Sequence, residues 1–130
     1  MADIGGSCLC GKITYRISGE LRPVVACHCN QCSKASGHYV AATQALAGDM
    51  EIKGAPQWYQ SSDMAERGFC PTCGSNLFWR RRGSEFVSIH AGGLDGPTGL
   101  KMTTQLYCES AGDYYDPPDL ECIDQVTLKY

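Results

Sequence analysis

Short stretches in which apolar and polar residues alternate run along most of the chain, with a period of two residues. This alternation is typical of β-strands that bury one face. The strands that it predicts cover residues 12–17, 24–26, 38–43, 50–53, 57–60, 66–69, 76–79, 86–90 and 102–107. One short helix is predicted over residues 30–35, and Ser36 and Gly37 should end it because glycine tolerates the left-handed cap conformation. The pattern therefore indicates a mainly β fold with short helical turns.

Composition agrees with a small domain that is rich in turns. The chain has 130 residues, of which 43% are apolar, 15 are glycine and six are proline. This length predicts a single domain over residues 1–130 with a modest core. Segment 112–120 contains Pro117 and Pro118, and we expect it to be irregular.

Charge and hydropathy narrow the class of protein. The net charge of −3 makes nucleic acid an unlikely partner, because nucleic-acid binding needs a basic face. The basic run at residues 80–82 is expected to be a solvated hairpin turn. The absence of long apolar runs predicts no membrane span, and the N-terminal residues do not form a signal peptide. We therefore expect a cytoplasmic protein with reduced cysteines, which favours metal ligands over disulfides.

Seven of the nine cysteines fall into three tight clusters. They are Cys8 with Cys10, Cys27 with Cys29 and Cys32, and Cys70 with Cys73. Two closed four-thiolate zinc sites would need eight ligands. Seven thiols therefore indicate one closed tetrahedral site and one site with a vacant position, where water or substrate can bind.

The pair Cys70 and Cys73, followed by Gly74, has the spacing of a zinc knuckle, in which two intervening residues let both sulfurs reach one metal. Cys8 and Cys10 are the natural donors of the other two ligands. A site closed in this way would tie the N-terminal strand to the middle of the chain. Its metal would add to the stability of a fold whose apolar content is thin, because a structural zinc contributes ~10–16 kcal/mol of apparent folding free energy.

The triplet of Cys27, Cys29 and Cys32 can grip one metal from one side, which leaves the fourth position to something that is not local. Water and a substrate thiolate are two candidates for it. The side-chain candidates are Cys108, Cys122, His28, His38 and His90. Cys108 and Cys122 can equally be inert buried thiols, whereas His28, between two ligands, should point away from the metal. His90 can equally be a satisfied histidine at a strand end.

Three blocks of sequence resemble the glutathione-dependent formaldehyde-activating enzymes and their relatives around centromere protein V. The blocks are GSCLCGKITY at residues 6–15, CHCNQCSKASG at residues 27–37 and RGFCPTCGSNL at residues 67–77. They occur in the family's order and with compatible spacing, and the resemblance extends over residues 5–116. The chain departs from the family where a tryptophan is common in the C-terminal segment, since Tyr114 and Tyr115 stand there instead.

The resemblance implies a mainly β, Mss4-like (β-tent) fold that holds two zinc ions. The structural zinc would be held by Cys8, Cys10, Cys70 and Cys73, and the second zinc by Cys27, Cys29 and Cys32 with one position open. Three local thiolates hold a metal less completely than four, so we expect the second zinc to be the more labile. In the named enzymes the open zinc serves the joining of glutathione and formaldehyde to S-hydroxymethylglutathione. This is carbon–sulfur lyase chemistry running in the synthetic direction.

Glutathione carries two carboxylates, so its binding site should hold cations. Lys34 and Arg67 are the candidates for that role, Ser36 and Gly37 can supply hydroxyl and backbone donors, and Tyr39 can line a pocket wall. Each of these residues also has an ordinary structural role available to it. The competing hypotheses are a non-catalytic zinc module that binds a protein partner on the same fold and, more weakly, a redox or zinc-buffering protein. A closed fourth position on the second zinc would favour them over the enzyme.

Overall fold

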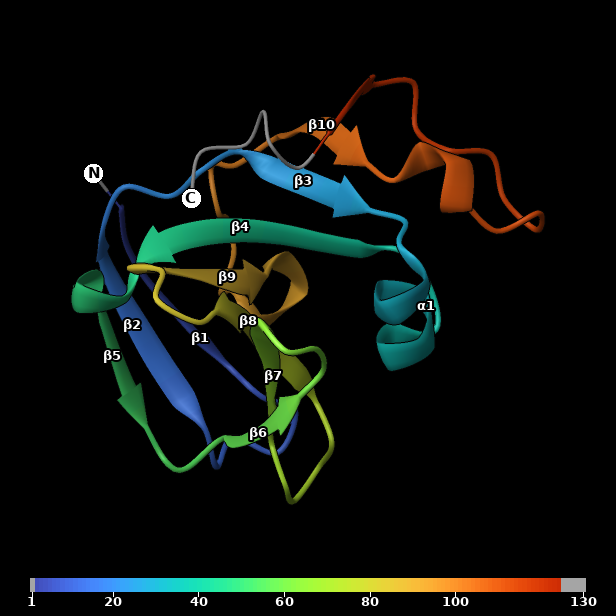
Figure 1. Cartoon of the computed structure of the whole chain (residues 1–130). Coiled ribbons are helices and arrows are strands. Elements are labelled where there is room, and N and C mark those ends of the chain that lie inside the picture. Colours follow the sequence, from blue (N-terminus) through green and yellow to red (C-terminus); the bar gives the residue numbers. More distant parts are fainter. Residues whose placement is uncertain (1, 125–130) are drawn as a thin grey trace.

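A computed structural model describes residues 2–124 of the chain, and within that span the fold is built mainly of β-strands (Figure 1). The strands are β1 Ala2–Ser7, β2 Thr14–Gly19, β3 Val24–Cys27, β4 Val40–Leu46, β5 Met50–Lys53, β6 Gln57–Gln60, β7 Ala65–Phe69, β8 Asn76–Arg81, β9 Phe86–His90, β10 Met102–Leu106 and β11 Glu121–Ile123. The helical elements are α1 Asn30–Ser36 and the short 3-10 turns Ala47–Asp49, Ala91–Gly93 and Cys108–Ser110. The prediction of a mainly β fold with short helical turns is confirmed.

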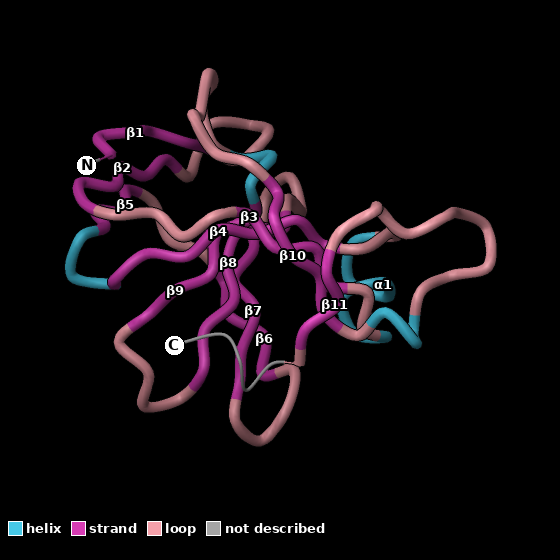
Figure 2. Tube along the Cα trace, turned by 90° about the horizontal axis from the view of Figure 1, so that it is seen from above, coloured by secondary structure: helices cyan, strands magenta, loops and turns pink. Residues whose placement is uncertain are grey.

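The strands form two sheets. A small sheet has the order β1-β2-β5, and a large one has the order β11-β10-β3-β4-β9-β8-β7-β6. Neighbouring strands are antiparallel except at one end of the large sheet, where β10 runs parallel to both β3 and β11. Figure 2 shows this end of the sheet beside α1 and the long C-terminal loop.

The hydrophobic core lies between the two sheets. Tyr15 and Ile17 of β2 are buried while the alternating Thr14 and Arg16 are exposed, which is the period-two pattern of a strand that is covered on one face. From the large sheet, Phe78 meets the Tyr15 ring edge-on, with ring centroids 5.2 Å apart. The core therefore covers one face of the large sheet, and the other face is available to form a binding site.

Strand register brings a set of residues together on that second face. The paired sets are Leu106 with Cys27 and Val40, Val25 with Ala42 and His90, and Ser88 with Trp79 and Arg67. Side chains that are directly opposite one another across a sheet point to the same face. Six strands thus contribute to one surface, at one end of which the cysteine triplet begins.

The predicted helix is confirmed, together with the signals that end it. The Sγ of Cys29, which precedes α1, accepts a hydrogen bond from the Cys32 N–H, and Gly37 takes the left-handed conformation at φ 87°. The Gly37 N–H donates to the Ser33 carbonyl at 2.8 Å and so satisfies a helix-end acceptor.

Two strands were not predicted. β1 contains Gly5 and Gly6 and shows no alternation, but it pairs along its length with β2, and Gly6 lies so close to the Tyr15 ring that any side chain there would collide with it. β11 is only three residues long and pairs with β10. The irregular course predicted for residues 112–120 is confirmed. The turn predicted for the basic run is partly wrong, because Arg80 and Arg81 end β8, where Arg80 pairs with Glu66, and only Arg82 enters the turn to β9. None of the helices within the described span has the length and apolar content that crossing a bilayer requires.

Cys108 and Cys122 form a disulfide bond, which corrects their reading as inert thiols or as metal ligands. The preference for reduced cysteines followed from the expected cytoplasmic setting, whereas disulfides are typical of oxidising compartments. The bond joins the segment after β10 to β11 and closes the base of the loop between them. The remaining seven cysteines within the described residues are free thiols.

Candidate metal centres and the adjoining cavity

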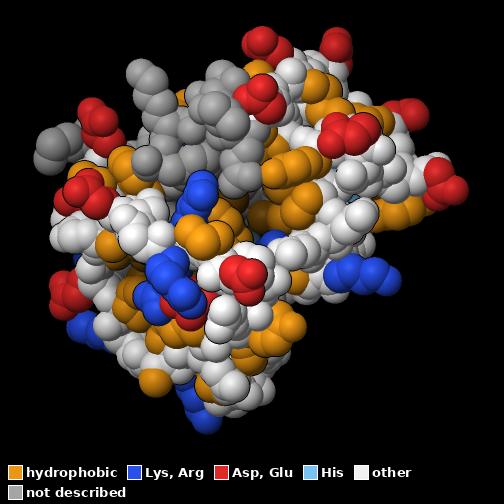
Figure 3. Space-filling model, in the orientation of Figure 1, with side chains coloured by type: hydrophobic (Ala, Val, Ile, Leu, Met, Phe, Trp, Pro, Cys, Tyr) orange, Lys and Arg blue, Asp and Glu red, His pale blue; other side chains and the backbone are white. Residues whose placement is uncertain are grey.

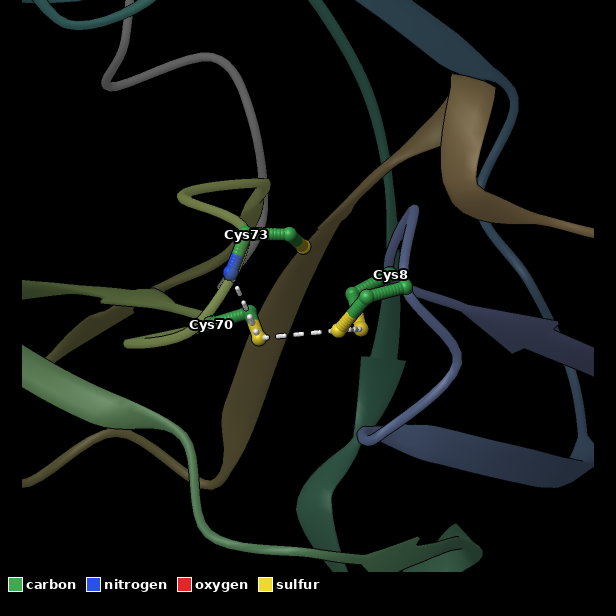
Figure 4. A group of neighbouring side chains, drawn as sticks. Cys8, Cys70 and Cys73 are labelled. Atoms are coloured by element: carbon green, nitrogen blue, oxygen red, sulfur yellow. Dashed lines mark hydrogen bonds between the residues drawn. The ribbon is translucent and has the colours of Figure 1, made fainter.

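Two turns of the same design face each other where the sheets meet (Figure 4). The turn between β1 and β2 carries Cys8 and Cys10, and the turn between β7 and β8 carries Cys70 and Cys73. Each turn ends in a glycine, Gly11 or Gly74, whose φ of 79° only glycine adopts readily.

Backbone hydrogen bonds close the two turns in the same way. The Cys8 N–H donates to the Ile13 carbonyl and the Cys70 N–H donates to the Ser75 carbonyl, both at 3.0 Å. The Leu9 N–H then reaches across to the Ser75 hydroxyl at 2.9 Å and links one turn to the other. The two turns are therefore held in place by the protein chain as well as by any metal between them.

The four sulfurs of this group fit a tetrahedral zinc ion. They all lie within 4.8 Å of one another, with 3.6 Å between Cys8 and Cys10 and 3.8 Å between Cys10 and Cys70. Zinc–sulfur bonds of about 2.3 Å in a tetrahedron place sulfurs about 3.8 Å apart. The hydroxyl of Ser75, 3.2 Å from the Cys73 sulfur, lowers the pKa of the Cys73 thiol to about 5, which favours the thiolate that metals bind.

A second group of three sulfurs comes from one short segment. Cys27 ends β3, Cys29 caps α1 and Cys32 lies inside the helix, and their sulfurs are also within 4.8 Å of one another. No other cysteine, histidine or carboxylate from residues 2–124 joins this group. Two cysteine clusters that can hold metal ions are thus present, and the second offers three protein ligands.

Charge and hydrogen bonding favour a thiolate within this triplet. Contacts with the Cys27 and Cys32 thiols, helped by the positive charge of Arg67, lower the pKa of the Cys29 thiol to about 2. The guanidinium of Arg67 lies 3.8 Å from the Cys32 sulfur. The contacts that lower the pKa of Cys29 raise that of Cys27, so these surroundings favour one thiolate among the three sulfurs.

His28 is fully buried, and both of its ring nitrogens are engaged by protein groups. The Gln105 amide nitrogen donates to the Pro118 and Leu120 carbonyls, so its Oε1 must accept from the His28 Nε2–H at 2.9 Å. His28 Nδ1 then accepts from the Tyr115 hydroxyl at 2.6 Å. His28 points away from the three sulfurs of the triplet, as expected. Its hydrogen bond to Tyr115 attaches the C-terminal loop to the segment that carries the triplet.

The remaining candidates for the fourth position are also accounted for. His38 is exposed and stacks loosely with Tyr39 and Tyr114. Cys108 and Cys122 are paired with each other. His90 does not belong to the triplet's ligand group but lines the cavity beside it.

The triplet forms part of the wall of a cavity of about 400 Å³. Its apolar wall includes Val25, Val40, Trp79 and Leu106, all of which project from the free face of the large sheet. Figure 3 shows apolar side chains around a hollow near the centre of this face, with Lys and Arg side chains beside it. The cavity therefore has apolar side chains along its wall and the sulfurs of the triplet at one end.

Three basic side chains line the same cavity, namely Arg22, Arg67 and His90. Arg22 also donates to the Gln44 side chain and to the Ala42 carbonyl, each at 3.3 Å. Burial, together with the charge of Arg67, lowers the pKa of His90 to about 4, so its imidazole is neutral at pH 7.

The residues predicted to bind substrate are spread over several places. Arg67 lines the cavity, while Lys34 lines a neighbouring groove of about 560 Å³ to which Arg67 also contributes. The Ser36 hydroxyl lies within hydrogen-bond distance of the Cys32 and His38 carbonyls, and Gly37 caps the helix. Tyr39 packs against His28 and His38. Lys34, Ser36, Gly37 and Tyr39 do not line the cavity that holds the triplet.

Sequence reasoning missed Arg22 and Trp79 as cavity residues and considered His90 only as a metal ligand or a satisfied histidine. The available signal was strand phase, because Ser88 and His90 alternate with the buried Val87 and Ile89 of the core. Polar residues in the phase opposite to the core mark a second face, but only the register of β9 with β4 shows that this face meets the triplet.

The chain is similar to a known protein family, to a named relative and to a solved structure. Residues 3–110 match the sequence profile described as "Glutathione-dependent formaldehyde-activating enzyme". A protein of Schizosaccharomyces pombe, named as an uncharacterized lyase, is 27% identical over 118 residues, which cover 89% of this chain and 86% of that protein. The crystal structure of a Rhodobacter sphaeroides protein has a TM-score of 0.59 and 26% identity, and covers 76% of this chain and 99% of its own.

Proposed function

Because the chain belongs to the family of glutathione-dependent formaldehyde-activating enzymes, we propose that it is a zinc-dependent carbon–sulfur lyase that adds glutathione to formaldehyde. The observation that carries the proposal is the cysteine triplet in the wall of a cavity that also presents two arginines. The yeast relative that is named as a lyase supports the same class of reaction. Residues 1–130 are proposed to act as one domain.

Two zinc ions are proposed per chain. Cys8, Cys10, Cys70 and Cys73 would hold the first, and Cys27, Cys29 and Cys32 would hold the second. A zinc ion at the triplet would supply an open position that binds a thiol as its thiolate or polarises a carbonyl oxygen. Among residues 2–124 no further side chain completes the triplet's ligand set, which supports a position open to substrate.

The chain's own residues would bind and orient glutathione. Arg67 borders both the cavity and the neighbouring groove, so it can bind one carboxylate while the thiol enters the cavity. Lys34 in the groove can bind the other carboxylate. Charge-assisted contacts of this kind are directional and strong, and they would hold the thiol beside the triplet.

The apolar wall would receive the aldehyde. Val25, Val40 and Leu106 carry no hydrogen-bonding side-chain groups, and they line the cavity beside Cys27 on the same face of the sheet. Such a wall excludes water from the reacting carbonyl, which limits competing hydration and strengthens electrostatic interactions within the site. Proximity of thiol and aldehyde in this space would provide much of the rate enhancement.

The proposal is tested by metal content and by reaction rate. Elemental mass spectrometry of protein purified under reducing conditions, without chelator, should give two zinc ions per chain, and one for Cys29→Ser. NMR exchange between hydrated formaldehyde and the S-hydroxymethyl adduct should be accelerated by the wild type and not by Cys29→Ser. Unchanged exchange in Cys29→Ser would refute a role for the triplet.

A matched control is the double variant Cys108→Ser/Cys122→Ser, which removes two sulfurs outside both groups. It should keep both zinc ions and the wild-type exchange rate. Two bound zinc ions without any acceleration of the exchange would instead favour the non-catalytic module.

A further inference from the structure

His90 differs from the buried His28 because its imidazole has no evident structural role. It ends β9 and lines the cavity, yet its ring nitrogens have no hydrogen-bond partner among residues 2–124. His28, in contrast, has both nitrogens occupied by Tyr115 and Gln105. A half-buried imidazole that is left free in a cavity is available to a ligand.

Register places His90 on the same face of the large sheet as the start of the triplet, two strands away from it. His90 stands opposite Ala42 on β4, which stands opposite Val25 on β3, and Cys27 follows on the same face of β3. Two strand spacings of about 4.8 Å separate the backbones of β3 and β9. His90 and the three cysteines line the same cavity, whose volume of about 400 Å³ leaves room for a thiol and a small carbonyl.

The charged and titratable groups that share the cavity with His90 are Arg22, Arg67, Tyr107 and the three cysteines. Burial disfavours the imidazolium form and so lowers the pKa of His90, and the charge of Arg67 acts in the same direction. The resting imidazole is therefore a proton acceptor, and the imidazolium that it becomes is a strong proton donor.

We propose that His90 is a catalytic residue that carries the proton from the thiol sulfur to the carbonyl oxygen. This inference rests on the proposed function. The thiol gives its proton to an imidazole nitrogen, and the sulfur electron pair forms the S–C bond. The π electrons of the carbonyl move to its oxygen, which then takes the proton from the imidazolium. Thiol and aldehyde thus give the hydroxymethyl thioether without loss or gain of atoms or electrons, and the reverse reaction retraces the same transfers.

The test compares His90→Asn with the wild type in the NMR exchange reaction, with glutathione varied to saturation. General acid–base catalysis typically contributes 10²–10⁴-fold, so kcat should fall about 100-fold while KM for glutathione changes less than about twofold. The control His38→Asn alters an exposed histidine outside the cavity and should keep the wild-type kcat and KM.

Four further readouts separate a catalytic role from a structural one. Zinc content and thermal melting of His90→Asn should match the wild type, and His90→Gln replaces it if they do not. In His90→Ala, added imidazole should restore part of the lost kcat, because the cavity has room for it. Glutathione binding, measured by calorimetry, should be unchanged in all three variants.

Each outcome decides the inference. A kcat within about twofold of wild type in His90→Asn or His90→Gln overturns it, as does a loss of kcat that imidazole fails to restore in folded, zinc-loaded His90→Ala. A wild type that does not accelerate exchange overturns the proposed function instead, independently of any His90 variant.

Discussion

The two cysteine groups have the same kind of ligand but differ in how the chain supplies it. The four-sulfur group joins turns that are distant in sequence, one from each sheet, and the turns are locked together by the Leu9 to Ser75 hydrogen bond. The three-sulfur group comes from six consecutive residues and faces a cavity with two arginines. Long-range ligands can stabilise a fold, whereas local ligands leave the far side of the metal free for chemistry.

The residues around the two cysteine groups differ as well. Around the four-sulfur group lie core residues such as Ile13, Leu77 and the fully buried Cys70. Around the triplet lie Arg67 and His90, whose charge or ring nitrogens are not used up by the fold. The group among core residues is therefore separate from the group beside the cavity, so that substitutions can alter one without the other.

The largest expected effect comes from breaking the four-sulfur group. Cys70→Ser should lose one zinc ion and the cooperative thermal unfolding transition, because a structural zinc is worth ~10–16 kcal/mol of folding free energy and small domains have only about 5–15 kcal/mol in total. Circular dichroism melting with elemental analysis measures both. Cys29→Ser is the matched variant at the triplet, and its melting should stay close to that of the wild type. Equal destabilisation by the two variants would break the comparison.

A smaller effect is expected from removing the cation beside the triplet. Arg67→Met should raise KM for glutathione about tenfold, since hydrogen bonds to charged groups contribute ~1.5–3 kcal/mol, and should leave melting almost unchanged. Arg81→Met, at an exposed position on β8, serves as the control.

The same variant has a pH signature. In the wild type, the pKa of His90 near 4 keeps its imidazole neutral until the pH falls through that value. Without the Arg67 charge the pKa should rise, so that protonation begins at higher pH. Histidine NMR titration measures the change, and an unaltered titration in Arg67→Met would show that burial alone sets the pKa.

The smallest expected effect concerns the loop that is pinned to the triplet. Tyr115→Phe removes the hydroxyl that donates to His28 Nδ1 and should cost about 1 kcal/mol of unfolding free energy, because the buried nitrogen loses its partner. Tyr114→Phe changes a neighbour that is 64% exposed and should cost close to nothing. Denaturant unfolding measures both, and equal costs would mean that the hydrogen bond from Tyr115 to His28 contributes no stability.

The sequence was sufficient to predict most strands, the helix and the pairing of cysteine clusters, because each has a local cause. Alternation exposes one face of β2, Gly37 ends α1, and two residues between Cys70 and Cys73 bring their sulfurs together. The similarity of three sequence blocks then indicated the family, which the match over residues 3–110 confirms.

The cavity could not be predicted because its wall has no local cause. Trp79, Ser88 and His90 meet the triplet only through the register of β8, β9, β4 and β3, and sequence spacing does not specify register between distant strands. β1 was not predicted because it shows no alternation. Its Gly6 has no side chain, and the Tyr15 ring occupies the space where a side chain would lie. The disulfide between Cys108 and Cys122 also depends on a partner across the sheet end.

The parallel pairing of β3 with β10 has a consequence for the newborn chain. The triplet leaves the ribosome with β3, but the strand that flanks it, β10, is made near the end of synthesis. At about 5–20 residues per second, the three thiols wait for several seconds without their cavity. Until β10 is made, the three thiols lack the part of the cavity wall that Leu106 and Tyr107 supply, so the order of synthesis leaves the triplet open to solvent until late in translation.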